Sequence, residues 1–312
     1  MSFITKNTQK NLERLEKILP KYINNQVVPK DVLVIIEKCI RKQLTDKNIH
    51  QIVQHYLCNN GNLKQQVINN YGKISDWDVS QVTDMNHLFN DLKNFNEDIS
   101  NWNVSNVTNM LGMFYEAKNF NQPLNTWNVS KVKTMGSLFF KTISFNQPLN
   151  DWNVSNVTNM LGMFYGAKNF NQPLNNWNVS NVIDMRWMFQ GATSFNQPLN
   201  NWNVSKVTNM VIMFALANSF NQPLNSWNVS NVTNMESMFD NATSFNQPIN
   251  TWNVSNVTNM NRMFYNARVF NQPLNNWNVS KVKNMSGMFS NTESFNQPLN
   301  NWNVSNVTDM EA

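Results

Sequence analysis

Tryptophan recurs every 25 residues through most of this 312-residue chain. Only Trp187 lies outside the register, and no insertion interrupts the series. A fixed period of 20–50 residues is typical of solenoids and propellers, and a four-stranded propeller blade needs about 40. The period therefore predicts a coil of nine full 25-residue repeats and a partial tenth. The register residues are Trp77, Trp102, Trp127, Trp152, Trp177, Trp202, Trp227, Trp252, Trp277 and Trp302.

Each repeat begins with a pattern that predicts a short strand. Leu174, Trp177 and Val179 have the L-x-x-L-x-L spacing of a leucine-rich-repeat strand, with Trp in the middle position. The apolar residues alternate with Asn and Ser, as a strand with one buried face requires. We expect the strands of successive repeats to form a parallel sheet, with Trp102 to Trp277 stacked as a core ladder. Asparagines such as Asn203 are expected to link one turn to the next.

The second half of each repeat has helical spacing. Met185, Met188, Phe189 and Ala192 follow one another at i, i+3, i+4 and i+7, which is one face of a helical turn. Pro198 then interrupts any helix and restores an extended chain. The predicted fold class is a leucine-rich-repeat-like α/β solenoid, with one short parallel strand and one helical turn per repeat and an α-helical N-terminal cap.

The sequence divides into a helical capping domain over residues 1–70 and the repeats over 71–312. Apolar periodicity predicts a first helix early in the head and a second that opens at Pro29. Thr45 is a candidate N-cap for a third helix, Asp46–Cys58, with Gly61 as its stop, and a short fourth follows around Leu63–Asn70. Such a head suits a solenoid, because the first core layer must be covered.

The repeat unit MFxxAxxFNQPLNxWNVSNVTNM resembles the BspA-like leucine-rich repeat family, whose bacterial surface protein repeats are about 26 residues long. Proteins of protists and large DNA viruses also contain such repeats. The resemblance covers residues 71–312 and implies a right-handed leucine-rich-repeat-type solenoid that serves surface display or protein binding, without catalytic residues. The 63 asparagines and the helical head suggest a protist or giant-virus member.

A second resemblance offers another interpretation of the head. Residues Val28–Ile40, VPKDVLVIIEKCI, look like the start of an F-box. This would make the chain a substrate adaptor for a cullin ubiquitin ligase, with a Skp-type adaptor as its partner. Any amphipathic helix that begins at a proline has a similar pattern, so the head is either a cap or an F-box-like module.

The residues give no support for catalysis, a metal or a cofactor. His50 and His55 are five residues apart on the predicted third helix and point to different faces, and Cys39 and Cys58 belong to no C-x-x-C pair. The sequence contains no P-loop and no G-x-G-x-x-G. The lysines of the head are scattered singly, so we expect no nucleic-acid partner.

The chain is expected to be cytoplasmic, in a host cell or a virion if it is viral. Its first twenty residues contain no apolar stretch of signal-peptide length, and no apolar run reaches the 18 residues of a membrane span. A surface adhesin that is exported without a signal peptide remains an alternative.

Three sets of residues are candidates for binding. Arg186 and Trp187 form the candidate anchor for a protein partner, although Trp187 could instead cover a gap at the core edge. Asp151, Asn176 and Asn201 belong to the few variable positions of the expected concave face. Trp302 and Val304 would form an open last layer and support an end-to-end homodimer. The predicted function is a non-enzymatic scaffold for protein–protein interaction, with an adaptor or an adhesin as alternatives.

Overall fold

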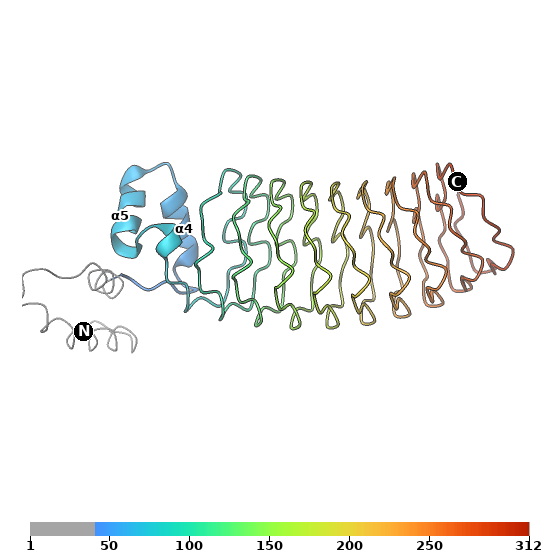
Figure 1. Ribbon diagram of the computed structural model, residues 1–312, viewed down its shortest axis with the longest axis horizontal. Coiled ribbons are helices and arrows are strands. Elements are labelled where there is room, and N and C mark those ends of the chain that lie inside the picture. Colours follow the sequence, from blue (N-terminus) through green and yellow to red (C-terminus); the bar gives the residue numbers. More distant parts are fainter. Residues whose placement is uncertain (1–40, 312) are drawn as a thin grey trace, which may run out of the picture.

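The chain folds into a short helical head followed by a long stack of turns, in a computed structural model that describes residues 41–311 (Figure 1). Each turn lies beside the turn before it along the long axis. We number the turns from their register tryptophans. The head lies at one end of the stack and the C-terminal turn at the other. The first two predicted helices, Cys39 and the F-box-like segment Val28–Ile40 lie outside the described residues.

The described part of the head contains α4 (Ile49–Leu57), α5 (Gly61–Tyr71) and the short 3₁₀ helix η1 (Ile74–Asp76). The predicted third helix was placed too early, because Thr45 precedes a tight turn and Asn48 is the N-cap of α4.

Gly61 begins a helix instead of ending one. The side chain of Asn60 accepts hydrogen bonds from the backbone amides of Asn62 and Leu63, which is the usual N-cap arrangement. The predicted fourth helix, around Leu63–Asn70, corresponds to α5, which begins earlier, at Gly61, and ends at Tyr71.

Successive turns are joined by parallel bridges that involve one residue per turn. Nine bridges link positions 25 residues apart, from Asp84 to Asp309. Further backbone hydrogen bonds run between turns: the amide of Met160 donates to Asp184 at 3.1 Å and the amide of Trp187 to Val211 at 3.0 Å.

The strand expected at Leu174–Val179 is not formed. The amide of Trp177 donates to the carbonyl of Leu174 at 3.1 Å and closes a tight turn, so it cannot join a ladder. The bridge of this repeat lies at Asp184 instead. Within residues 41–311 no strand is longer than a single bridge.

The helical turn expected at Met185–Ala192 is a run of overlapping tight turns. Trp187 and Gly191 have φ angles of 61° and 66°, a left-handed conformation that a right-handed helix does not contain. The amide of Phe189 donates to Met213 in the next turn at 2.9 Å. The predicted burial is nevertheless confirmed, because all four apolar residues of the pattern are fully buried.

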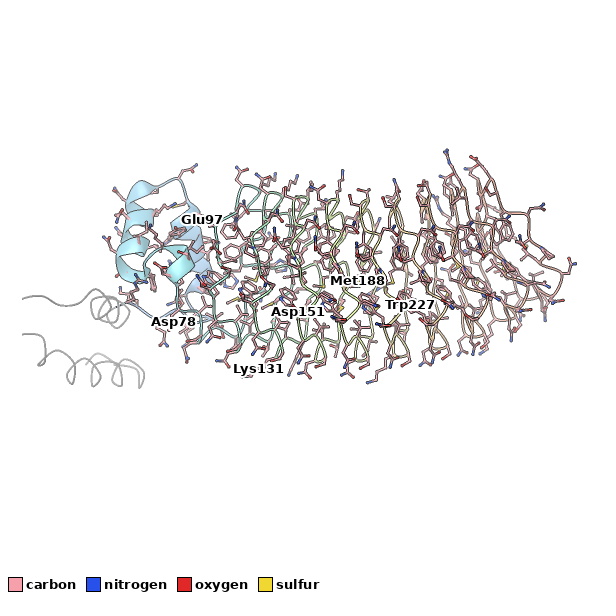
Figure 2. The ribbon with its side chains drawn as sticks, viewed as in Figure 1. Asp78, Glu97, Lys131, Asp151, Met188 and Trp227 are labelled. Carbon is pink, nitrogen blue, oxygen red and sulfur yellow. The ribbon has the colours of Figure 1, made fainter. Side chains whose placement is uncertain are left out.

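The core consists of columns in which each side chain packs on its own copies. Trp177 and Trp202 have ring centroids 6.3 Å apart and are nearly parallel, and Phe164 and Phe189 are 5.6 Å apart. Tryptophan rings stack at 6.3–6.5 Å from Trp152 to Trp277, and each register tryptophan from Trp102 to Trp277 is 2–3% exposed. Figure 2 shows the side chains of these turns, with Trp227 among them.

Asparagines have different partners at different positions of the repeat. Asn203 accepts the amide of Ser205 at 3.1 Å, within its own turn, so the expectation that it links turns was wrong. Asn196 does link turns: its side-chain oxygen accepts the backbone amide of Asn221 and the side-chain amide of Gln222 in the next repeat.

The head covers the first core layer of the stack. One carboxylate oxygen of Asp46 accepts the amides of Thr83 and Asp84 at 2.7 and 3.1 Å, and the other accepts the Thr83 hydroxyl. The ring of Tyr56 packs edge-on against Trp77, with centroids 5.4 Å apart. The head thus supplies both an acceptor and an aromatic surface to the first turn.

Candidate protein-binding face

One strip of the surface changes from turn to turn, whereas most other outward positions repeat Asn, Ser or Thr. In the turn that begins at Trp177 it consists of Arg186, Trp187, Gln190 and Gly191, which lie between the buried residues of the core columns. We call the strip formed by these four positions along the stack the variable face.

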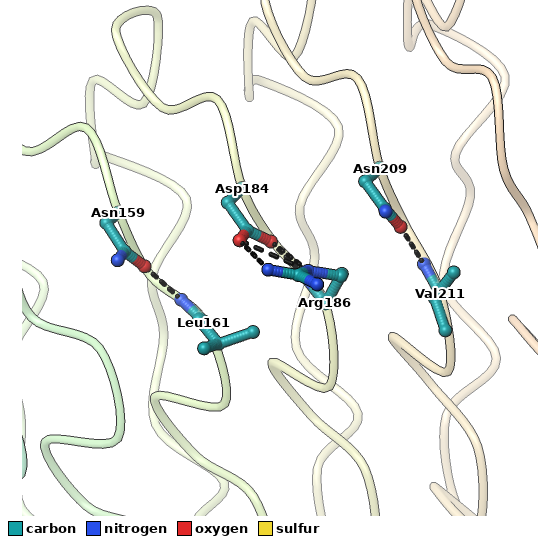
Figure 3. A network of polar contacts seen from close by, with 6 residues as sticks. All are labelled: Asn159, Leu161, Asp184, Arg186, Asn209 and Val211. Atoms are coloured by element: carbon teal, nitrogen blue, oxygen red, sulfur yellow. Dashed lines mark hydrogen bonds and ion pairs between the residues drawn. The ribbon is translucent and has the colours of Figure 1, made fainter.

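In eight of the nine full turns, an Asn or Asp side chain accepts a backbone amide at the start of this face. Asn159 accepts the amide of Leu161 at 2.9 Å, and Asn209 accepts the amide of Val211 at 3.0 Å (Figure 3). Such local side-chain-to-backbone bonds stabilise turns without any helix or strand. The variable side chains therefore project from a repeated backbone.

Arg186 is held by its own turn. Asp184 accepts hydrogen bonds from Nε at 3.0 Å and from a terminal guanidinium nitrogen at 2.6 Å (Figure 3). The hydrogen bond to Asp184 raises the pKa of the Arg186 guanidinium, against the opposing effect of desolvation. Because its charge is already paired, Arg186 is a weaker anchor than its sequence suggests.

Trp187 is 37% exposed and belongs to none of the core columns. Within residues 41–311, its indole N–H donates to no other residue. In the next turn Leu216 is 45% exposed, so two large apolar side chains occur on neighbouring turns of the variable face.

A shallow cavity of about 260 Å³ opens beside Leu216. Ile212 and Leu216 contribute apolar surface, and the opposite part contains the ion pair of Asp240 and Arg262, at 3.1 Å. The remaining lining residues are Gln190, Ala215, Ser237 and Asn241.

Three aromatic rings stack on the variable face nearer the head. The centroid of Tyr115 lies 4.4 Å from that of Phe140, which lies 4.2 Å from that of Tyr165, and the planes are nearly parallel. We call these three residues the aromatic column. The aromatic column is not among the candidates expected from the sequence, although its rings occupy the same position in three successive repeats.

The second set of candidates lies elsewhere on the turn. Asp151, Asn176 and Asn201 are exposed, one per turn, just before a register tryptophan (Figure 2 labels Asp151). The backbone amides of Asn176 and Asn201 donate to asparagine side chains of the preceding turn. No hydrogen bond between described residues joins this set to Arg186 or Trp187.

The candidates for self-association line a cavity in the last turns. Trp302 stacks on Trp277 at 6.5 Å and is half-buried, and Val304 is 38% exposed. Both line a cavity of about 480 Å³, together with Met288 and Phe289. These contacts do not test the predicted homodimer, which stays a prediction.

The described histidines and acidic residues form no metal site. His50 Nε2 lies 2.7 Å from the carbonyl oxygen of Asn86 in the first turn, and so contributes to the contact between head and stack. Within residues 41–311, no three His, Cys, Asp or Glu side chains gather as a metal site would require. No helix in this range is long and apolar enough to cross a membrane.

Comparison with known proteins assigns the repeats to a family. A family model described as "Mycoplasma protein of unknown function, DUF285" matches residues 59–160, 144–242 and 223–312. The chain belongs to the DUF285 repeat family. The three overlapping matches begin just before α5 and extend to the end of the sequence, so the tandem-repeat character is shared with the family. No curated protein and no solved structure matches the chain.

Proposed function

We propose that this DUF285 protein is a non-enzymatic scaffold that binds a protein partner through its variable face. The stack would then be a leucine-rich-repeat-like solenoid of the BspA-like type, with bridges in place of longer strands. One observation carries the proposal: Trp187 and Leu216 are exposed on the face that changes between turns, while the repeated core is buried. Exposed aromatic and apolar groups in a polar surrounding are typical of protein interfaces.

The geometry of the stack supports this function. A regular backbone presents one set of variable side chains per turn, at an expected spacing of about 4.8 Å. Binding energy in protein interfaces is concentrated in a few buried aromatic or apolar residues. Trp187 has the size and exposure for such a residue, and its neighbours Ile212 and Leu216 extend the apolar surface.

The test compares three forms of the full chain as bait in cells that express it. One bait is unchanged, one carries Trp187→Ser and Leu216→Ser, and one carries Ile183→Ser. Ile183 is 49% exposed but lies outside the variable face, so it controls for the loss of an apolar surface side chain. Circular dichroism first establishes that all three baits are folded.

Co-purifying proteins are then quantified by mass spectrometry. We expect a defined set of proteins to be retained by the unchanged chain and by Ile183→Ser and to be lost with the double variant. Equal recovery by all three baits would place the interface on another surface. Recovery of nothing above the background of empty resin would contradict the scaffold function itself.

A further inference from the structure

The aromatic column lies in a cluster of lysines. Lys141 Nζ is 5.5 Å from the Phe140 ring centroid and donates to Glu116 at 3.0 Å. The hydrogen bond from Lys141 lowers the pKa of Glu116, and the nearby charges of Lys118 and Lys93 lower it further. Three ammonium groups therefore act on one carboxylate. The turns of Lys93 and Lys118 are in direct contact, since the amide of Asn119 donates to the carbonyl of Lys93 at 3.0 Å.

The cluster has a positive balance. Lys168 adds a fourth ammonium group in the turn of Tyr165, and Asp91 and Glu116 are the acidic residues beside the column on the variable face. Four positive and two negative charges leave a net charge of +2. In the three turns beyond Lys168 the equivalent positions are the uncharged Thr193, Asn218 and Thr243. The next one is Arg268, which pairs with Glu293 at 3.6 Å.

The way in which the rings stack determines what they can bind. The two faces of Phe140 are covered by Tyr115 and Tyr165, so no base or aromatic group can stack on the middle of the column. Ring edges carry partial positive charge. Among the described residues, neither tyrosine hydroxyl hydrogen-bonds to another side chain or to the backbone, so both can donate to a ligand. Edges, hydroxyl donors and ammonium groups together suit carboxylates.

The same strip continues into the apolar part of the face. Four steps separate the turn of Tyr115 from the turn of Leu216. At about 4.8 Å per step this is about 19 Å, or roughly six residues of extended chain. A single short segment can therefore reach the aromatic column with one part and Trp187 with another.

We propose that the aromatic column and its lysines bind an acidic segment of a protein partner, whose apolar residues continue onto Trp187 and Leu216. The inference rests on the proposed function and specifies the chemistry of the partner. Nucleic acid fits less well, because stacking on bases needs open ring faces and both faces of Phe140 are covered.

The experiment selects phage-displayed random dodecapeptides on the full chain and measures the enriched peptides by fluorescence anisotropy. The test variant is Lys118→Gln/Lys168→Gln, which leaves the Glu116–Lys141 pair intact. Its matched control is Lys133→Gln/Lys283→Gln, which removes the same charge from exposed lysines at a different position of the repeat, that of Ile183. A second test variant, Tyr115→Phe/Tyr165→Phe, removes the two hydroxyls and keeps the rings.

We expect the selected peptides to be rich in Asp and Glu and to bind about fivefold or more weakly to each test variant, with little change in the control. Their affinity should also fall as salt is raised, because exposed charges are screened. Neutral or basic peptides, or acidic peptides that bind both test variants normally, would overturn the inference.

Two further outcomes separate the inference from the proposed function. If peptide binding is lost only with Trp187→Ser/Leu216→Ser, the scaffold function stands and the acidic docking site is excluded. Failure to select any peptide would count against both. A fluorescent oligothymidylate of twelve nucleotides is measured in parallel, and tight binding that depends on Lys118 and Lys168 would assign the cluster to nucleic acid instead.

Discussion

The indole N–H of Trp177 donates to the carbonyl oxygen of Leu149, 28 residues earlier in the sequence, at 2.8 Å. The same carbonyl accepts the backbone amide of Trp152 at 3.0 Å. One buried oxygen therefore closes a tight turn and also binds the following repeat. Each register tryptophan from Trp102 to Trp302 makes the corresponding indole bond, so this link holds the turns together along the stack. The indole of Trp77 donates instead to the carbonyl of Gly72 in the head.

Trp177→Phe should lower the free energy of unfolding by about 2 kcal/mol. The substitution removes the indole bond and leaves a gap in the column, while the Leu149 carbonyl keeps its bond to Trp152. Urea unfolding followed by circular dichroism measures the loss. Trp302→Phe removes the same bond at a half-buried position and should cost less. Equal losses at the two positions would contradict the link between burial and cost.

The period and the core could be predicted from the sequence because they depend on which residues are apolar. Spacing alone predicts that Trp177, Met188 and Phe189 belong to the core, and all three are buried. The secondary structure could not be predicted in this way, because the same apolar spacing fits both a helix and a run of tight turns. Backbone hydrogen bonds that connect different turns decide between them, and such bonds follow from the stacking of turns.

A sequence signal for the tight turns does exist. Five of the eight glycines occur at two positions of the repeat, and the residues at both positions have positive φ in all nine full turns. These glycines are Gly112, Gly162, Gly166, Gly191 and Gly287. The recurrence of glycine at these two positions is a sequence signal against a helical turn in the repeat.

The candidate site was predictable only in part. Trp187 is conspicuous in the sequence because it breaks the register. The pairing of Arg186 with Asp184 was not foreseen, because it depends on a turn that brings residues i and i+2 together. The aromatic column becomes evident only when Tyr115, Phe140 and Tyr165 are compared across repeats and their rings are seen to stack.

Leu216→Gly should stabilise the protein by about 0.5–1 kcal/mol. Leu216 has φ of 59° and is 45% exposed, so glycine relieves the left-handed backbone conformation and gives up little burial. Thermal unfolding should show a higher midpoint. Val211→Gly, at a position in the same turn without positive φ, should lower the midpoint. A decrease for Leu216→Gly would mean that the packing of the leucine outweighs the backbone strain.

The contact between Asp46 and the first turn should make stability depend on pH. Burial would raise the pKa of Asp46, but hydrogen bonds from Thr83 and the amide of Asp84 together lower it below its ordinary value. The folded state therefore favours the carboxylate. The contribution of the Asp46 carboxylate to the free energy of unfolding is complete above the unfolded-state pKa of about 3.9. It is lost as the pH falls through the lower pKa of the folded state.

We therefore expect Asp46→Asn to lower the midpoint of thermal unfolding at pH 6 and to reduce the further fall between pH 4.5 and pH 2.5. Asp98→Asn is the comparison, because hydrogen bonds from Ser100 also lower the pKa of Asp98, within a local turn and not between head and stack. Proteolysis of the head at low pH distinguishes Asp46→Asn from Asp98→Asn, since only loss of the Asp46 contact should release the head from the stack. An unchanged pH profile for Asp46→Asn would refute this account of the head.

Gly112→Ala should destabilise the protein more than Gly191→Ala. Both glycines have positive φ, so alanine is strained at either position by about 1 kcal/mol. At Gly112, however, the new methyl group would lie 2.5 Å from a ring carbon of His87, whereas at Gly191 the nearest atom is 3.7 Å away. The difference in the free energy of unfolding between the two variants measures the cost of displacing the His87 ring. In the double variant His87→Ala/Gly112→Ala the steric contact is absent, so the second substitution should cost no more than Gly191→Ala does. A full additional loss in the double variant would show that the cost at Gly112 comes from the backbone alone.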